Sequence, residues 1–169
     1  MLKSIKLSLV KRRIANSNNF SSGELKLPIT SGVLLLDSVH IRSLPVLLRL
    51  KKELNLKDLN FKVILYKMKG EDFPEFDGLI FVEDDISFLG KLNNKELLDF
   101  TKNHVDLLIT FAEENHVPIN LLTTNLAACL KLGNDPNSEK ILDVVIRSGD
   151  DAEVFTSEIL KFLNQFKNT

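Results

Sequence analysis

The sequence has little of several residues on which common sites depend. It contains one cysteine, Cys129, and no tryptophan. A single thiol forms neither an internal disulfide nor a cysteine-rich zinc site, and its apolar surroundings predict a small buried side chain. No apolar run reaches the roughly 20 residues that a membrane-spanning helix needs, and Lys6 interrupts any secretory signal. These absences predict a cytoplasmic protein in a reducing compartment.

Motifs for nucleotide and hydrolytic chemistry are also missing. Residues 37–43, which follow the first predicted strand, contain no glycine, so a dinucleotide or P-loop phosphate site is not expected there. The chain has neither a G-x-S-x-G nucleophile motif nor an H-E-x-x-H zinc motif. We therefore assign no catalytic residue, no metal ligand and no cofactor from the sequence.

Charge is distributed unevenly, although the net charge is only −1. The first twenty residues carry five bases and no acid, so the rest of the chain is acidic. Leu2, Ile5 and Leu9 recur among these bases near helical spacing, which predicts a short amphipathic helix. Residues 16–23 are rich in Asn, Ser and Gly and read as a linker. The expected organisation is a basic helix and linker over residues 1–28, followed by one domain over residues 29–169.

Strand and helix patterns alternate through this domain. The run Gly32–Asp37 is continuously apolar up to its last residue, as expected for a strand buried on both faces. Further strands are expected over residues 61–66, 79–82, 105–111 and 141–146. Helices are expected over residues 43–54, 94–104, 118–133 and 150–166, with Pro118 and Gly133 at the start and end of the third.

This alternation predicts an α/β fold in three layers, with a mostly parallel five-stranded sheet of the Rossmann-like or flavodoxin-like kind. The connection between the second and third strands is too short for a normal helical crossover. The third strand is therefore expected either to pair antiparallel with the second or to cross over through a loop.

Ligands of such sheets bind beyond the carboxyl ends of the strands. Acidic residues follow four of the predicted strands, in the segments 37–38, 83–85, 113–114 and 148–150. Carboxylates that converge there would suit Mg²⁺, although strand-end acids more often cap helices and interact with water. His40 is the histidine best placed for chemistry. The candidate ligand site consists of Asp37, Ser38, His40, Asp84, Asp85 and Glu113.

The basic N-terminal segment is the other candidate for function. Its bases suit an acidic protein surface, a ribonucleoprotein or RNA, and suit a membrane surface less well because the apolar face is short. No DNA specificity is expected. The alternative is that the helix packs against its own acidic domain. The proposed partner-binding residues are Lys3, Lys6, Lys11, Arg12 and Arg13.

Two functions follow from these candidates. We favour a non-enzymatic interaction or assembly protein that docks on a larger partner through its N-terminal segment. The alternative is a ligand-binding domain, or a magnesium-dependent enzyme, that uses the acidic strand ends. A deep pocket at those ends would favour the alternative, and a flat surface with a projecting helix would favour docking.

Several segments together resemble an uncharacterised family of small proteins common in Bacteroidota. The similarity lies in the basic run at residues 11–13, the strand at 32–37 and the segment 84–90, and in the later segments 105–109 and 125–133. The resemblance covers most of the chain and implies a cytoplasmic α/β domain. It implies no activity and no catalytic residues.

Overall fold

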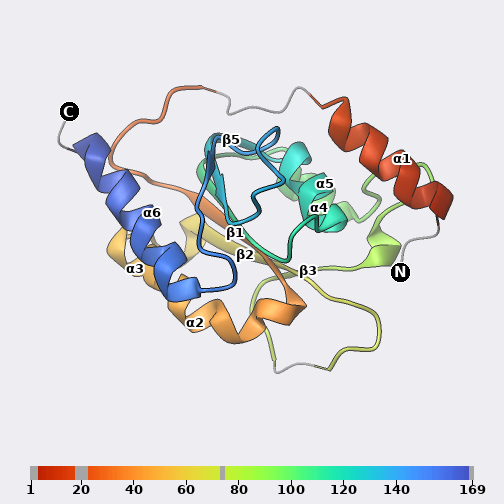
Figure 1. Cartoon of the computed structure of the whole chain (residues 1–169), viewed down its shortest axis with the longest axis horizontal. Coiled ribbons are helices and arrows are strands. Elements are labelled where there is room, and N and C mark those ends of the chain that lie inside the picture. The colour runs from red at the N-terminus through yellow and green to blue at the C-terminus, as the bar shows by residue number, and fades with distance from the viewer. Residues whose placement is uncertain (1–3, 18–22, 73–74, 168–169) are drawn as a thin grey trace.

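The computed structural model describes residues 4–17, 23–72 and 75–167. It contains a sheet of six parallel strands in the order β3-β2-β1-β4-β5-β6 (Figure 1). The strands are β1 (Gly32–Asp37), β2 (Phe61–Tyr66), β3 (Leu79–Phe81), β4 (His104–Phe111), β5 (Ala127–Gly133) and β6 (Val144–Val145). The predicted α/β class with a mostly parallel sheet is confirmed, but the sheet has six strands and not five.

Helices cover both faces of the sheet (Figure 1). One face carries α2 (Leu44–Leu47), α3 (Arg49–Glu53) and α6 (Ala152–Lys167). The other carries α1 (Ser4–Ala15), α4 (Lys95–Thr101) and α5 (Val117–Asn125). Short 3₁₀ turns complete the fold: η1 (Ser38–Ser43), η2 (Asp58–Asn60) and η3 (Glu83–Asp85).

The core consists of two hydrophobic clusters separated by the sheet. All six residues of β1 are buried, as the continuous apolar run predicted. Leu34 and Leu36 pack in the cluster under α2, α3 and α6, whereas Val33 and Leu35 pack in the cluster under α1, α4 and α5. Successive side chains of a strand point to opposite faces, so a strand with helices on both sides is apolar throughout.

The strand order is the one found in Rossmann-type sheets. The orientation of the third strand, which the sequence left open, is parallel: β3 pairs with β2 in parallel after a connection without a helix. After β1, the chain adds β2 and β3 towards one edge of the sheet. After β4, it adds β5 and β6 towards the opposite edge. The carboxyl ends of β1 and β4 are therefore the point at which the order reverses.

The helix predicted over residues 118–133 is wrong in its second half. Helix α5 ends at Asn125, and residues 127–133 form β5 between β4 and β6. The apolar residues there also alternate with a period of two, which fits a strand. A Cβ atom at Gly133 would overlap the hydroxyl of Thr110 on β4. Gly133 therefore allows close approach between two strands and does not cap a helix.

Other predicted boundaries shift by a few residues. The side chain of Asn94 accepts a hydrogen bond from Leu97 N and caps α4 as expected, but the helix ends at Thr101 and β4 already begins at His104. The strand predicted over residues 141–146 is reduced to β6. Ser43 precedes α2 without capping it, and Cys129 is half-buried on β5.

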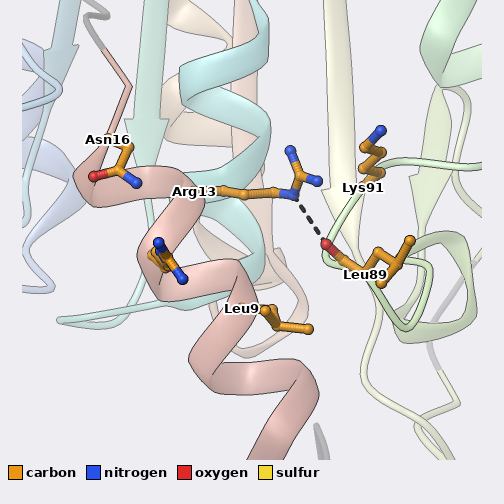
Figure 2. Close-up of a pocket in the computed structure, with 6 residues that line it drawn as sticks. Leu9, Arg13, Asn16, Leu89 and Lys91 are labelled. Atoms are coloured by element: carbon orange, nitrogen blue, oxygen red, sulfur yellow. Dashed lines mark hydrogen bonds between the residues drawn. The ribbon is translucent and has the colours of Figure 1, made fainter.

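Helix α1 packs against α5 and does not project from the domain (Figure 1). Val10 has no exposed surface. Lys6 Nζ donates to the carbonyl of Glu83 (3.1 Å), and Arg13 Nε donates to the carbonyl of Leu89 (2.9 Å; Figure 2). Whether residues 29–169 fold without residues 1–28 stays a prediction. Within the described ranges, no helix is long and apolar enough to cross a membrane.

A lysine lies inside the domain. Lys131 on β5 has no exposed surface, and its Nζ donates to the carbonyl of Thr123 in the last turn of α5 (2.8 Å). Burial lowers the pKa of Lys131 from 10.5 to about 8, and the nearby Asp143 charge partly opposes this shift. Lys131 thus satisfies a carbonyl at a helix end while its ammonium form is disfavoured.

This lowered pKa predicts that alkaline pH stabilises the protein. Between pH 8 and 10, the unfolded chain keeps the Lys131 proton that the folded chain releases, so the free energy of unfolding should rise by roughly 2 kcal/mol. Urea denaturation from pH 7 to 10 measures it. The rise should vanish in Lys131→Met and persist in Lys62→Met, which changes an exposed strand lysine. An identical pH dependence in both variants would contradict the prediction.

Candidate functional site at the strand switch point

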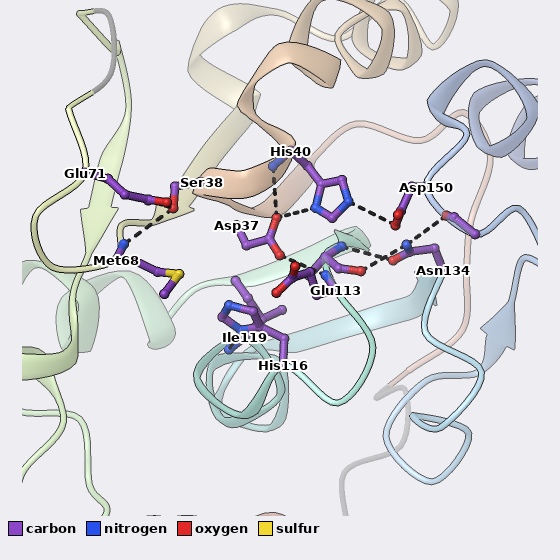
Figure 3. Close-up of polar contacts among 12 residues, drawn as sticks. Asp37, Ser38, His40, Met68, Glu71, Glu113, His116, Ile119, Asn134 and Asp150 are labelled. Carbon is purple, nitrogen blue, oxygen red and sulfur yellow. Dashed lines mark hydrogen bonds and ion pairs between the residues drawn. The ribbon is translucent and has the colours of Figure 1, made fainter. Parts of the chain in front are cut away.

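The carboxyl ends of β1 and β4 bring three predicted site residues together. Asp37 ends β1 and is 1% exposed, His40 follows it in η1, and Glu113 follows β4. One oxygen of Asp37 is hydrogen-bonded to His40 Nδ1, and the other accepts from the backbone N–H of Glu113 at 2.8 Å (Figure 3). The aspartate therefore joins two neighbouring strand ends.

A second carboxylate lies on the other side of the His40 ring. His40 Nε2 is 3.0 Å from Asp150 Oδ1 in the loop before α6 (Figure 3). The hydrogen bond to Asp37 raises the pKa of His40 above 6.5 despite the opposing effect of burial, and Asp150 adds to the rise. The two carboxylates thus favour the charged form of the ring.

Asn134, after β5, fixes the loop that carries Asp150. Its Oδ1 accepts from Ala112 N (3.0 Å), and its Nδ2 donates to the carbonyls of Ala112 and Gly149 (both 3.1 Å). The buried side chain therefore links the end of β4 to the loop before α6 (Figure 3). Sequence reasoning missed this residue, since an asparagine in a turn-rich segment is unremarkable on its own.

A cavity of about 330 Å³ opens beside this network. We call it the switch-point cavity. Carboxylates and one lysine gather on it, together with two aromatic rings and several apolar side chains. Its lining residues are Leu7, Tyr66, Met68, Lys69, Glu83, Glu113, Glu114, Asn115, His116, Val117 and Pro118.

His116 contributes a hydrogen-bond donor to the cavity. Its Nδ1 caps α5 by accepting a hydrogen bond from Ile119 N (3.2 Å), so the neutral ring carries its proton on Nε2. Burial lowers the pKa of His116 below 6.5, although the Asp37 charge opposes this effect. The ring is therefore neutral at pH 7. In the described part of the chain, its Nε2–H has no hydrogen-bond partner.

Tyr66, at the end of β2, contributes a second unpaired polar group. Its side chain is 7% exposed, and its ring packs edge-on against His116 at 5.0 Å between centroids. Burial, with the nearby Glu83 charge, raises the pKa of Tyr66 to about 12, so the hydroxyl is protonated. Among the described residues this hydroxyl has no partner. The hydroxyl oxygen is open to solvent, so the cavity offers a polar group to a ligand.

The remaining residues predicted for this site lie around it. The Ser38 hydroxyl donates to Glu71 and accepts from Met68 N (3.4 Å; Figure 3). Asp84 is exposed. Asp85 accepts hydrogen bonds from Val82 N (2.9 Å) and from the side chain of Asn94 (3.0 Å), which ties η3 to the start of α4.

No metal centre is evident among the residues that the structure describes. They contain no group of three His, Cys, Asp or Glu side chains that could hold a metal ion. The carboxylates of Asp37 and Asp85 instead accept hydrogen bonds from the protein.

The predicted partner-binding bases occupy different environments. Lys6 is half-buried and Arg13 is exposed, and each contacts a backbone carbonyl of the domain. Lys11 and Arg12 are exposed on α1. Lys3 lies outside the described residues.

Comparisons with known proteins give a family and no function. Neither the curated proteins nor the solved structures contain a match to this chain. A sequence model described as a family of unknown function, DUF6913, matches residues 2–166, which is nearly the whole sequence. The expectation of an uncharacterised domain is thereby confirmed, and the chain belongs to this family of unknown function.

Proposed function

We propose that the chain binds a small protonated amine in the switch-point cavity. The observation that carries the proposal is a tyrosine hydroxyl beside three glutamates: the oxygen of Tyr66 and the carboxylates can all accept hydrogen bonds from an ammonium group. These groups line one open cavity at the carboxyl ends of the strands, where ligands of parallel sheets bind. A cavity of about 330 Å³ suits a small ligand.

Charge selects the kind of ligand. Three carboxylates, those of Glu83, Glu113 and Glu114, line the cavity against the single cation of Lys69. Since His116 is neutral at pH 7, the lining has a net negative charge. This balance favours a cation and disfavours phosphates and other anions.

The other walls suit an aliphatic ammonium ion. The rings of Tyr66 and His116 form one wall, and the face of a tyrosine ring attracts an ammonium group. Leu7, Val117 and Pro118 provide apolar surface for methylene groups. The Asp37–His40 pair does not line the cavity, but it fixes the backbone of Glu113 beside it.

This choice departs from the docking function that the sequence favoured. Helix α1 lies against α5, and Leu7 of this helix forms part of the cavity wall. A deep pocket at the strand ends was the feature expected to favour ligand binding over docking, and the switch-point cavity lies at those ends but is open to solvent. The arrangement supports binding, and we assign no reaction to it.

Isothermal titration calorimetry with 1,4-diaminobutane tests the proposal. We expect binding in the millimolar range or tighter, with no heat from 1,4-butanediol, which has the same carbon chain without charge. Succinate should not bind, because the lining is acidic. Millimolar Mg²⁺ should not raise the melting temperature. Equal affinity for the diamine and the diol would overturn the proposal.

Two variants locate the binding. Tyr66→Phe should weaken diamine binding by about three- to tenfold, because a hydrogen bond contributes about 0.5–1.5 kcal/mol. Its melting temperature should stay close to that of the unmodified chain, since the hydroxyl has no partner among the described residues. The double variant Glu113→Gln, Glu114→Gln should weaken binding by about tenfold, whereas Glu96→Gln on α4 should not change it.

A further inference from the structure

A second concave surface lies between α1 and the turn after η3. A cavity of about 510 Å³ there is lined by Leu9, Arg12, Arg13, Asn16, Leu89 and Lys91. An adjacent cavity of about 350 Å³ shares Arg13 and Lys91 and extends past Leu92 and Leu98 towards the end of α5. Together these cavities form one continuous surface, which we call the α1 groove.

The wall opposite α1 is well ordered by its own hydrogen bonds. Ser87 N donates to the carbonyl of Lys91 (2.7 Å), and Gly90 N donates to the carbonyl of Ser87 (2.9 Å). Gly90 adopts a positive φ of 74°, and a Cβ there would lie 3.1 Å from Val10 N. The turn therefore packs closely against α1, so the groove exists before any partner binds.

The charge of the α1 groove is of one sign. Arg12, Arg13 and Lys91 line it, and neither of its two cavities is lined by an acidic residue. Arg13 donates its Nε–H to the Leu89 carbonyl, which holds the guanidinium beside the groove (Figure 2). The five N–H donors of an arginine leave the terminal NH₂ groups of Arg13 able to bind a carboxylate. Such a surface in a chain of net charge −1 is complementary to an acidic partner.

Apolar side chains lie between these cations. Leu9 forms one side of the groove, and Leu89, which is 60% exposed, forms the other (Figure 2). Phe88, next to it on the turn, is 58% exposed. Adjacent exposed apolar residues rimmed by charge are typical of protein interaction sites.

We propose that the α1 groove docks an acidic amphipathic segment of a partner protein. An aliphatic side chain of that segment lies between Leu9 and Leu89, and its carboxylates pair with Arg12, Arg13 and Lys91. A peptide fits better than RNA, because no residue that lines the two cavities is aromatic and base stacking would have only Phe88 beside the groove. The inference is independent of the amine site and uses other residues.

Fluorescence anisotropy with a labelled peptide tests this docking. The probe is a twelve-residue peptide of glutamate and leucine arranged to give one acidic and one apolar face, and a dodecamer of uridine is the RNA arm. The peptide should bind the full chain, and raising the salt concentration should weaken binding because exposed charge pairs are screened. A peptide with serine in place of leucine should bind at least threefold more weakly. No peptide binding, or tighter binding of the RNA, would overturn the proposal.

Variants assign the binding to the groove. The double variant Arg12→Ser, Lys91→Ser should weaken peptide binding at least tenfold, and Leu89→Ser should weaken it several-fold. All three side chains are exposed, so the melting temperature should change little. Lys161→Ser, on the opposite face in α6, should leave binding unchanged. An equal loss in that control would show non-specific charge attraction and overturn the assignment.

Discussion

Truncation of Leu35 or Ile109 to alanine is expected to lower the free energy of unfolding by about 2–5 kcal/mol each. Both side chains have no exposed surface, and they lie on the two central strands of the sheet. Leu35 packs in the cluster under α1, α4 and α5, and Ile109 in the cluster under α2, α3 and α6. Each truncation leaves a cavity in a core that cannot fully collapse around it. Such losses are large against a typical stability of about 5–15 kcal/mol.

Urea denaturation with an unchanged m-value measures these losses. Val154→Ala serves as the control, because Val154 on α6 is 42% exposed. This control should change the stability by no more than about 0.5 kcal/mol. A loss below about 1 kcal/mol at both Leu35 and Ile109 would contradict the packing of β1 and β4 described here.

The strands that the sequence predicted most clearly are those whose apolar pattern matches their burial in the folded sheet. The bounds of β1 and β2 match the predicted runs, because inner strands are buried on both faces and are mostly apolar, with Lys62 of β2 as the exposed exception. Strand β5 could not be identified in this way. Its residues fit a helix and a strand equally well, and the pairing with β4, including the close approach of Gly133 to Thr110, exists only in the folded sheet.

The candidate site was predictable to the extent that it depends on topology. Acids that follow parallel strands meet at one edge of the sheet, so Asp37 and Glu113 were expected to lie together. Tyr66 was not singled out, since an aromatic residue at the end of a strand reads as core. Its ring packs against His116, which lies 50 residues further along the chain, and this contact could not be read from either segment alone. Only the folded arrangement reveals a hydroxyl without a partner.

The largest polar effect is expected from Asp37→Ala. Asp37 accepts hydrogen bonds from the His40 ring, from His40 N (3.3 Å) and from Glu113 N (2.8 Å). The truncation leaves a buried histidine without its counter-ion and the Glu113 amide without its acceptor. Removal of one member of a buried ion pair typically costs about 3–5 kcal/mol. Asp99→Ala, on the exposed side of α4, should cost about 0.5 kcal/mol or less.

The pH dependence of this loss distinguishes the ion pair from a simple packing defect. Because the pKa of His40 is raised above 6.5, its stabilisation is fully present below pH 6.5 and is lost as pH rises through the folded pKa. The charged groups that face His40 are Asp37 and Asp150, and His116 lies nearby with a lowered pKa. His116 opposes the trend in both proteins, since protonation of the unfolded chain below pH 6.5 favours unfolding.

The difference in unfolding free energy between the unmodified chain and Asp37→Ala should therefore be largest near pH 5–6 and should decrease towards pH 9. Urea denaturation across this range measures it. Asp150→Ala should give the same trend with a smaller amplitude, because Asp150 is 80% exposed and its charge is screened by water. A difference that grows with pH, or one below about 1 kcal/mol throughout, would mean that Asp37 does not hold His40 in its charged form.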